Sequence, residues 1–96
     1  MKNIDVTELR DLLVNEKPEI VDVREIVEYK TGHVPTAKNI PLSEIEQRYT
    51  EISNGTYIIC QSGARSSLAC EYLASKGIET VNVSGGTSLW QEELEF

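Results

Sequence analysis

Seven consecutive residues, Cys60-Gln-Ser-Gly-Ala-Arg-Ser66, bring a thiol, a glycine, a guanidinium and two hydroxyls together. They follow a short apolar run, Thr56–Ile59, and precede a segment with helical spacing, so we expect a loop between a strand and a helix. Such a loop can turn its backbone N–H groups toward one point, and the N-terminus of the next helix adds a partial positive charge. The segment therefore predicts an anion-binding loop with Cys60 at its base.

A thiol in this position is expected to be reactive. Surrounding N–H groups stabilise the thiolate and lower the pKa of the thiol, and the thiolate is the form that acts as a nucleophile. We predict that Cys60 is the catalytic residue. The residues expected to bind substrate are Gln61, Ser62, Gly63, Ala64, Arg65 and Ser66. The alternative, a core cysteine that ends a strand, leaves Gly63, Arg65 and Ser66 unexplained.

Arg65 and Gly63 have separate expected roles. Gly63 permits backbone angles that other residues resist, which a tight loop requires. Arg65 is expected to supply a fixed cation that stabilises an anionic sulfur together with the helix N-terminus.

Alternating helical and apolar extended segments surround this loop. We expect helices over residues 7–14, 25–29, 66–75 and 87–93, and strands over residues 19–23, 56–59 and 80–83, with a brief extended segment at 38–42. Thr7 is expected to cap the first helix, and Ser43 with Glu46 forms an S-x-x-E capping box for a further helix.

Strands that alternate with helices indicate parallel β-α-β units. The predicted fold is therefore α/β, a three-layer sandwich in which helices flank a small, mostly parallel central sheet. One domain is expected over residues 1–96. Ligands of such sheets bind beyond the carboxyl ends of the strands, which is where Cys60 lies.

Composition and charge exclude several classes of function. The 96 residues are 40% hydrophobic and 26% charged, as in a soluble globular domain, and the net charge is −7. An acidic chain lacks the basic surface that nucleic acid or an anionic membrane attracts, so neither is an expected partner. Residues 1–5 have no apolar signal segment, and no run approaches the roughly 20 residues of a membrane span, so we expect a cytoplasmic location.

The two cysteines do not form a recognisable disulfide or metal pattern. Nine residues separate Cys60 from Cys70, and His33 is the only histidine, so no structural metal or other cofactor is expected. Cys70 lies at helical spacing from Leu73 and Ala74, which predicts a packed thiol in the core.

The Cys60–Ser66 loop also resembles the active-site loop of rhodanese-like domains, which are sulfurtransferases. Further segments match the family in order: Ile20–Glu25 with Glu28-Tyr29, Gly32–Ala37, Asn39–Leu42, and Val83–Gly86 followed by Trp90. The resemblance spans essentially the whole chain. It implies the rhodanese-like fold and a persulfide cycle, in which Cys60 takes a sulfur from a donor such as thiosulfate or a protein persulfide. A thiol or cyanide then accepts that sulfur.

The resemblance also suggests roles outside the loop. Asp22 is expected to support the loop through a salt bridge, and Arg24 to face the site, although an ordinary structural ion pair is the alternative. His33, within G-H-x-P, is expected to anchor a loop by hydrogen bonds. Trp90 and Phe96 are expected to pack in the core or at the terminus, and residues 92–95 to be solvated.

Two positions depart from the family pattern. Gln61 stands where many relatives carry a cationic residue, and Thr36 replaces a common glycine.

Loop length separates two chemistries. Four residues lie between Cys60 and Arg65, whereas cysteine-dependent phosphatases have five, because phosphate needs a wider loop. The sequence therefore favours sulfur over phosphate or arsenate. It leaves open whether the chain is an enzyme with turnover or a sulfur-relay or protein-binding module that uses the same Cys60. The donor, the acceptor and the oligomeric state are also open.

Overall fold

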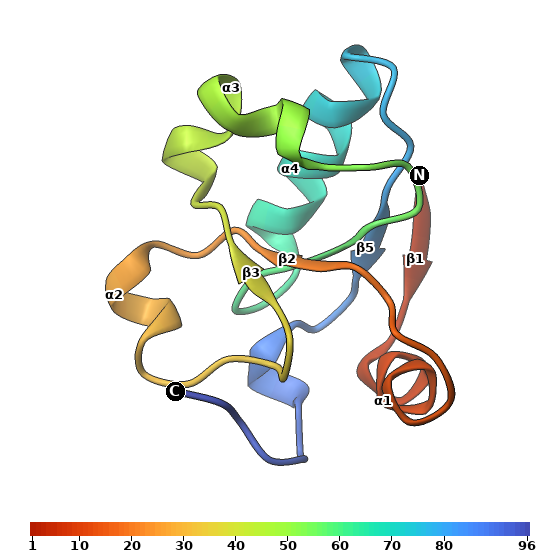
Figure 1. Cartoon of the computed structure of the whole chain (residues 1–96), viewed down its shortest axis with the longest axis vertical. Helices are drawn as coiled ribbons and strands as arrows, with labels where there is room; N and C mark the ends of the chain where they lie inside the picture. Colours follow the sequence, from red (N-terminus) through yellow and green to blue (C-terminus); the bar gives the residue numbers. More distant parts are fainter.

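Five short strands form one parallel sheet in the computed structural model, which describes residues 1–96 (Figure 1). The strands are β1 (Lys2–Ile4), β2 (Ile20–Asp22), β3 (Lys38–Asn39), β4 (Tyr57–Ile59) and β5 (Val81–Val83). Their order is β1-β5-β4-β2-β3, and every neighbouring pair is parallel. The carboxyl ends of all five strands therefore meet at one edge of the sheet.

Helices connect these strands. The α-helices are α1 (Val6–Asn15), α2 (Ile26–Tyr29), α3 (Ile45–Arg48) and α4 (Ala64–Ser75). Three short 3-10 helices are η1 (Leu42–Glu44), η2 (Tyr49–Glu51) and η3 (Thr87–Leu89). None of them combines the length and the apolar character needed to cross a membrane.

Successive residues of β4 point to opposite faces of the sheet and so into two cores. Ile58 packs with Ala69 and Leu73 of α4, whereas Ile59 packs with Leu9 of α1. Figure 1 shows α1 on one side of the sheet and α3 with α4 on the other. The chain thus forms the predicted three-layer α/β sandwich, and its sheet is parallel throughout.

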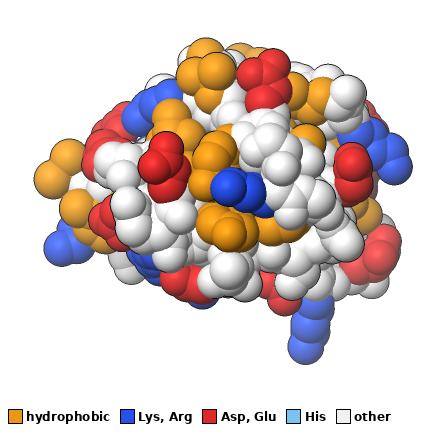
Figure 2. Space-filling view, turned by 90° about the horizontal axis from the view of Figure 1, so that it is seen from above, with side chains coloured by type: hydrophobic (Ala, Val, Ile, Leu, Met, Phe, Trp, Pro, Cys, Tyr) orange, Lys and Arg blue, Asp and Glu red, His pale blue; other side chains and the backbone are white.

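The face above α3 and α4 mixes acidic, basic and apolar side chains (Figure 2). Within this region, the Lys76 ammonium lies 5.4 Å from the ring centre of Tyr49 and 5.6 Å from that of Tyr72. These contacts cover the outer side of the core that α4 forms with the sheet.

Two predicted helix caps are wrong. Asp5, not Thr7, caps α1, because the helix begins one residue earlier: the Asp5 carboxylate accepts the Glu8 N–H at 2.8 Å. Ser43 caps no helix. It lies inside η1, and its hydroxyl donates to the Glu25 carboxylate at 2.9 Å, so α3 begins without a side-chain cap.

The last predicted helix, over residues 87–93, is also wrong. Only η3 forms, because Trp90 adopts extended backbone angles and packs its half-buried ring against the α1 core. The tail that follows is not simply solvated. Glu95 pairs with His33 as a short antiparallel bridge, and its carboxylate accepts the Thr36 N–H at 2.8 Å.

Sequence reasoning also missed β1 and misplaced the start of α4. β1 has three residues, only one of them partly buried, and it pairs with β5 alone at the edge of the sheet. α4 begins at Ala64 rather than Ser66, because Gly63, with φ of 104°, lies directly before the first helical turn.

Thr36 provides a test of backbone strain. It is the one non-glycine residue with positive φ, at 72°, and β-branched residues are disfavoured there. We predict that Thr36→Gly raises the free energy of unfolding by about 0.5–1 kcal/mol, after allowance for the entropy that glycine adds to the unfolded chain. Urea unfolding measures this difference.

The matched control is Thr7→Gly, which replaces an exposed threonine of α1 where φ is negative. This change should lower the free energy of unfolding by about 0.5 kcal/mol. If the free energy of unfolding falls in both Thr36→Gly and Thr7→Gly, the backbone of Thr36 is not strained.

Candidate active site

Cys60 follows the last residue of β4 and is 1% exposed. Its Sγ accepts the backbone N–H of Gly63 at 3.1 Å and that of Ser66 at 3.3 Å. The Ser66 hydroxyl oxygen lies 3.3 Å from the same sulfur. Three polar groups from the loop and the first turn of α4 therefore meet at Sγ, as the sequence predicted for an anion-binding loop.

Burial and hydrogen bonding act in opposite directions on Cys60. Burial raises the pKa of the thiol, because it disfavours the charged form. The Ser66 hydroxyl opposes this effect, as do the backbone N–H groups of Ser66, Gly63 and Ser62, and together they hold the pKa below its ordinary value. The hydrogen-bond donors around Sγ thus favour the thiolate form of Cys60.

Gly63 and Gly86 allow two backbone segments to approach each other closely. A Cβ atom at Gly63 would lie 3.3 Å from the backbone nitrogen of Gly85. A Cβ atom at Gly86 would lie only 2.3 Å from the carbonyl oxygen of Cys60, which also accepts the Thr87 N–H at 2.9 Å. The segment after β5 therefore fixes the base of the loop through backbone contacts.

Asn82 is a site residue that the sequence analysis missed. Its Oδ1 lies 2.5 Å from the hydroxyl of Ser66, which is fully buried, and its Nδ2 donates to Asn3 Oδ1 at 2.9 Å. A hydroxyl has one hydrogen, so Ser66 donates either to the sulfur of Cys60 or to Asn82, not to both. The sequence signal that could have revealed Asn82 as a site residue is its position as the polar residue in the middle of the apolar strand Val81–Val83.

Arg65 does not stand free beside the sulfur. Its two terminal nitrogens bind the two carboxylate oxygens of Glu28 at 2.7 and 2.9 Å. This contact lowers the pKa of Glu28 to about 2, and Glu28 is the main cause of the raised pKa of Arg65, with the thiolate of Cys60 a lesser one. The guanidinium that was expected to stabilise the sulfur of Cys60 is thus paired with a carboxylate. The sequence places Glu28 in a family motif and predicts no role for it at the loop.

Asp22 and Arg24 form a buried ion pair, 0% and 2% exposed. The Arg24 Nη2 donates to Asp22 at 2.9 Å and also to the carbonyl of Gly32 at 2.9 Å. Its Nη1 reaches the side chain of Gln61 at 3.5 Å. The pair is therefore a buried structural ion pair, which was the alternative prediction. It also contacts the loop, because Arg24 reaches Gln61.

The remaining loop residues, Gln61, Ser62 and Ala64, are exposed. The first two lie between the buried sulfur and the start of α4, and the Gln61 carbonyl accepts the Ser88 N–H at 2.9 Å. Of the seven predicted residues, the first four thus form the loop and the last three form the first turn of α4, with Arg65 directed to Glu28.

His33 and Cys70 occupy structural positions. The His33 ring stacks on Tyr29 at 3.7 Å between ring centres, and its Nδ1 lies 3.2 Å from the Tyr29 carbonyl. Cys70 is 3% exposed in the core between α4 and the sheet, and burial raises the pKa of its thiol. The two cysteines therefore have opposite pKa shifts.

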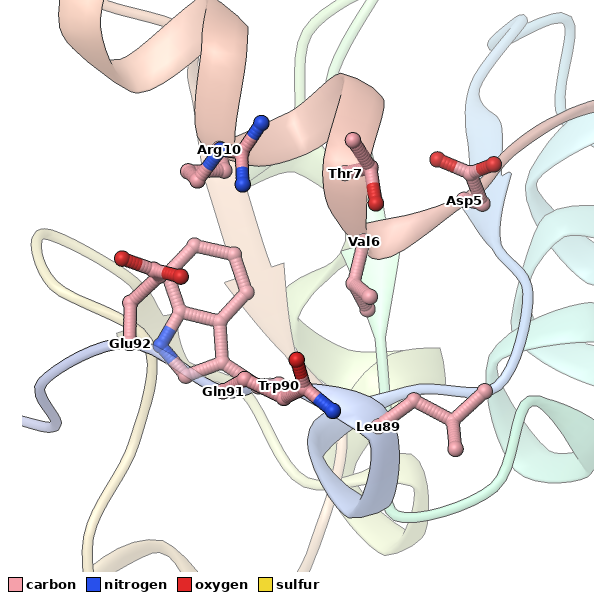
Figure 3. Close-up of a pocket in the computed structure, with 8 residues that line it drawn as sticks. All are labelled: Asp5, Val6, Thr7, Arg10, Leu89, Trp90, Gln91 and Glu92. Carbon is pink, nitrogen blue, oxygen red and sulfur yellow. The ribbon is translucent and has the colours of Figure 1, made fainter.

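Trp90 and Phe96 lie away from Cys60. Phe96 is 86% exposed, whereas Trp90 forms one wall of a cavity of about 330 Å³ between α1 and η3 (Figure 3). Asp5 and Arg10 lie on the opposite side of this cavity, and no residue of the Cys60 loop lines it. No three His, Cys, Asp or Glu side chains are grouped to ligate a metal ion.

Comparison with known proteins decides the family. The family model described as "Rhodanese-like domain" matches residues 5–93. The chain belongs to the rhodanese-like domain family. A "Sulfurtransferase" from Allochromatium vinosum is 39% identical over 74 residues, which is 74% of this chain and 69% of that protein.

Other members extend the comparison. A rhodanese-like domain protein from Staphylococcus aureus has a crystal structure that matches with a TM-score of 0.92 and 41% identity, covering 100% of this chain and 98% of that one. The Bacillus subtilis "Putative sulfur carrier protein YrkF" is 40% identical over 84 residues, 84% of this chain. The chain spans 45% of YrkF and 65% of a second Bacillus subtilis relative.

Ser66 gives the first test of this rhodanese-like site. We predict that Ser66→Ala raises the pKa of Cys60, because the thiolate loses one hydrogen-bond donor. The pH dependence of Cys60 alkylation, followed by mass spectrometry on a Cys70→Ser background, measures the shift.

Ser67→Ala is the matched control, since the Ser67 hydroxyl contacts Met1 and not Cys60. Its alkylation profile should coincide with that of the parent protein. Coincident profiles for both serine variants would mean that the Ser66 hydroxyl does not stabilise the thiolate.

Proposed function

We propose that this chain is a sulfurtransferase that carries a sulfane sulfur on Cys60. The donor is thiosulfate or a persulfide, including one held by a protein, and the acceptor is a thiol or cyanide. The observation that carries the proposal is the convergence of the Gly63 and Ser66 N–H groups on Sγ. Relatives named as a sulfurtransferase and as a sulfur carrier support the same chemistry.

The first step loads the sulfur. The Cys60 thiolate attacks the outer sulfur of a donor R–S–SH, a new S–S bond forms, and the donor S–S bond breaks. The electron pair leaves with R–S⁻, and the proton stays on the transferred sulfur, which gives Cys60–S–SH. With thiosulfate, sulfite leaves and the persulfide is formed as its anion. The lowered pKa of Cys60 supports this step, because it supplies the thiolate.

The second step unloads the sulfur. An acceptor thiolate attacks the outer sulfur of Cys60–S–SH, the S–S bond to Cys60 breaks, and Cys60 recovers its electron pair as a thiolate. Cyanide that attacks the persulfide anion leaves as thiocyanate. The N–H groups of Gly63 and Ser66 favour Cys60 as leaving group, because they stabilise the thiolate that forms.

Phosphoryl chemistry is less well supported. A phosphate ester would bring a dianion into the loop, and the guanidinium of Arg65 already binds both carboxylate oxygens of Glu28. The four residues between Cys60 and Arg65 also form a shorter loop than the phosphatases use.

A sulfur relay is the second candidate, and the name of YrkF favours it. A relay would receive sulfur from one protein and deliver it to another without appreciable turnover on small donors. Steady-state turnover, measured with cysteine persulfide as well as thiosulfate as donor and with cyanide as acceptor, separates the two, because a relay shows rapid single transfer and negligible turnover with either donor.

The proposal predicts which cysteine carries the sulfur. After incubation with thiosulfate or cysteine persulfide, intact mass spectrometry should show one added sulfur atom in the wild-type protein and in Cys70→Ser. Cys60→Ser should gain none, because Cys70 is buried in the core and its pKa is raised. An equal gain in Cys60→Ser and Cys70→Ser would contradict the assignment.

A further inference from the structure

Two guanidinium groups lie near Cys60, and a carboxylate already pairs with each. Arg65 binds Glu28 through two contacts at 2.7 and 2.9 Å. Arg24 binds Asp22 at 2.9 Å inside the core. No other lysine or arginine forms an ion pair or hydrogen bond with residues 60–66. The loop is therefore flanked by two neutral pairs and by no unpaired cation.

The absence of an unpaired cation at the loop affects which sulfur donor can bind. Thiosulfate brings two negative charges to a thiolate that already carries one, within a chain of net charge −7. Like charges repel each other strongly at short range unless a cation lies between them. Gln61, the exposed side chain next to Cys60, is neutral and adds no such cation. The backbone N–H groups of Gly63 and Ser66 already donate to the sulfur of Cys60.

The two elements that contact the loop, α2 and η3, carry exposed apolar side chains. Ile26 and Val27 of α2 are 48% and 71% exposed, and Leu89 of η3 is 58% exposed. Leu89 lies over Gly85, where an added Cβ atom would be 2.3 Å from its Cδ1. α2 contacts the loop through the Glu28–Arg65 pair, and η3 contacts it through the Thr87 N–H, which donates to the Cys60 carbonyl. Such surroundings suit the carbon chain of an organic donor better than a sulfonate group.

We propose that the sulfur donor of this site is an organic persulfide, R–S–SH, and not thiosulfate. The inference rests on the proposed function and narrows its substrate class. An organic persulfide carries at most one negative charge, as R–S–S⁻, and none in the protonated form R–S–SH that reacts with the thiolate, whereas thiosulfate carries two. The thiolate becomes Cys60–S–SH as R–S⁻ leaves with the electron pair of the broken bond, so atoms and charge balance without an added cation.

Glu28 is the position at which this selectivity can be changed. Glu28→Gln removes the carboxylate that neutralises Arg65 but keeps an oxygen that can accept the Glu25 N–H of the α2 cap. The freed guanidinium can then bind an oxyanion. Glu79→Gln is the matched control. It changes the net charge equally, its side chain is exposed, and it lies just before the amino end of β5, at the edge of the sheet opposite Cys60.

The experiment compares donors in single-turnover reactions of the full chain on a Cys70→Ser background. Cysteine persulfide, serum albumin that carries a persulfide, and thiosulfate are each mixed with the protein. Intact mass spectrometry gives the rate constant of sulfur addition to Cys60. The two persulfides distinguish a low-mass donor from a protein donor, since the faster of them identifies the source.

We expect the faster persulfide to react about 100-fold faster than thiosulfate. This factor corresponds to two charge-assisted hydrogen bonds that thiosulfate would need from cations and that this site does not provide. Glu28→Gln should raise the thiosulfate rate relative to cysteine persulfide by about tenfold, the effect of one such contact, and Glu79→Gln should leave that ratio unchanged. Equal wild-type rates with thiosulfate and persulfides, or an unmoved ratio in Glu28→Gln, would overturn the inference alone. Absence of sulfur addition from every donor would contradict the proposed function itself.

Discussion

The site depends on the hydrogen bonds that the backbone N–H groups of Gly63 and Ser66 donate to the sulfur of Cys60. Those N–H groups reach Sγ because α4 starts immediately after a glycine with φ of 104°, at the carboxyl edge of a parallel sheet. The loop and the segment after β5 can approach this closely because Gly63 and Gly86 lack side chains where the two segments meet. A Cβ atom at either position would press against the backbone of the facing segment.

The same hydrogen bonds act on the pKa of Cys60, a thiol that is only 1% exposed. Burial alone raises the pKa of a cysteine, as it does for Cys70 only ten residues along the chain. Cys60 differs because hydrogen-bond donors surround its sulfur, and their effect exceeds that of burial. The Ser66 hydroxyl lies within hydrogen-bond distance of both this sulfur and Asn82 of β5, and its one hydrogen can serve only one of them at a time. Asn82 therefore competes with the Cys60 thiolate for that hydrogen.

Much of this arrangement could be predicted from the sequence, because the information is local. Cys60 at the end of an apolar run, Gly63 and a following helix define the loop without reference to distant residues. The partners of the loop could not be found in this way. Glu28 and Asn82 are 37 and 16 residues from the side chains they contact, and only the parallel packing of β5 and the placement of α2 bring them there. The cap of α1 was misplaced for another reason: Asp5 and Thr7 are both good capping residues, and only Asp5 exchanges hydrogen bonds with Glu8 at the helix start.

The central claim is that hydrogen bonds, not burial, decide the ionisation of Cys60, and the two cysteines of one chain test it directly. The absorbance of the thiolate, followed during a pH titration, gives the pKa of Cys60 in Cys70→Ser and that of Cys70 in Cys60→Ser. We expect Cys60 to titrate below the ordinary value of about 8.5 and Cys70 above it. Two coincident titrations, or Cys60 titrating above Cys70, would contradict the claim.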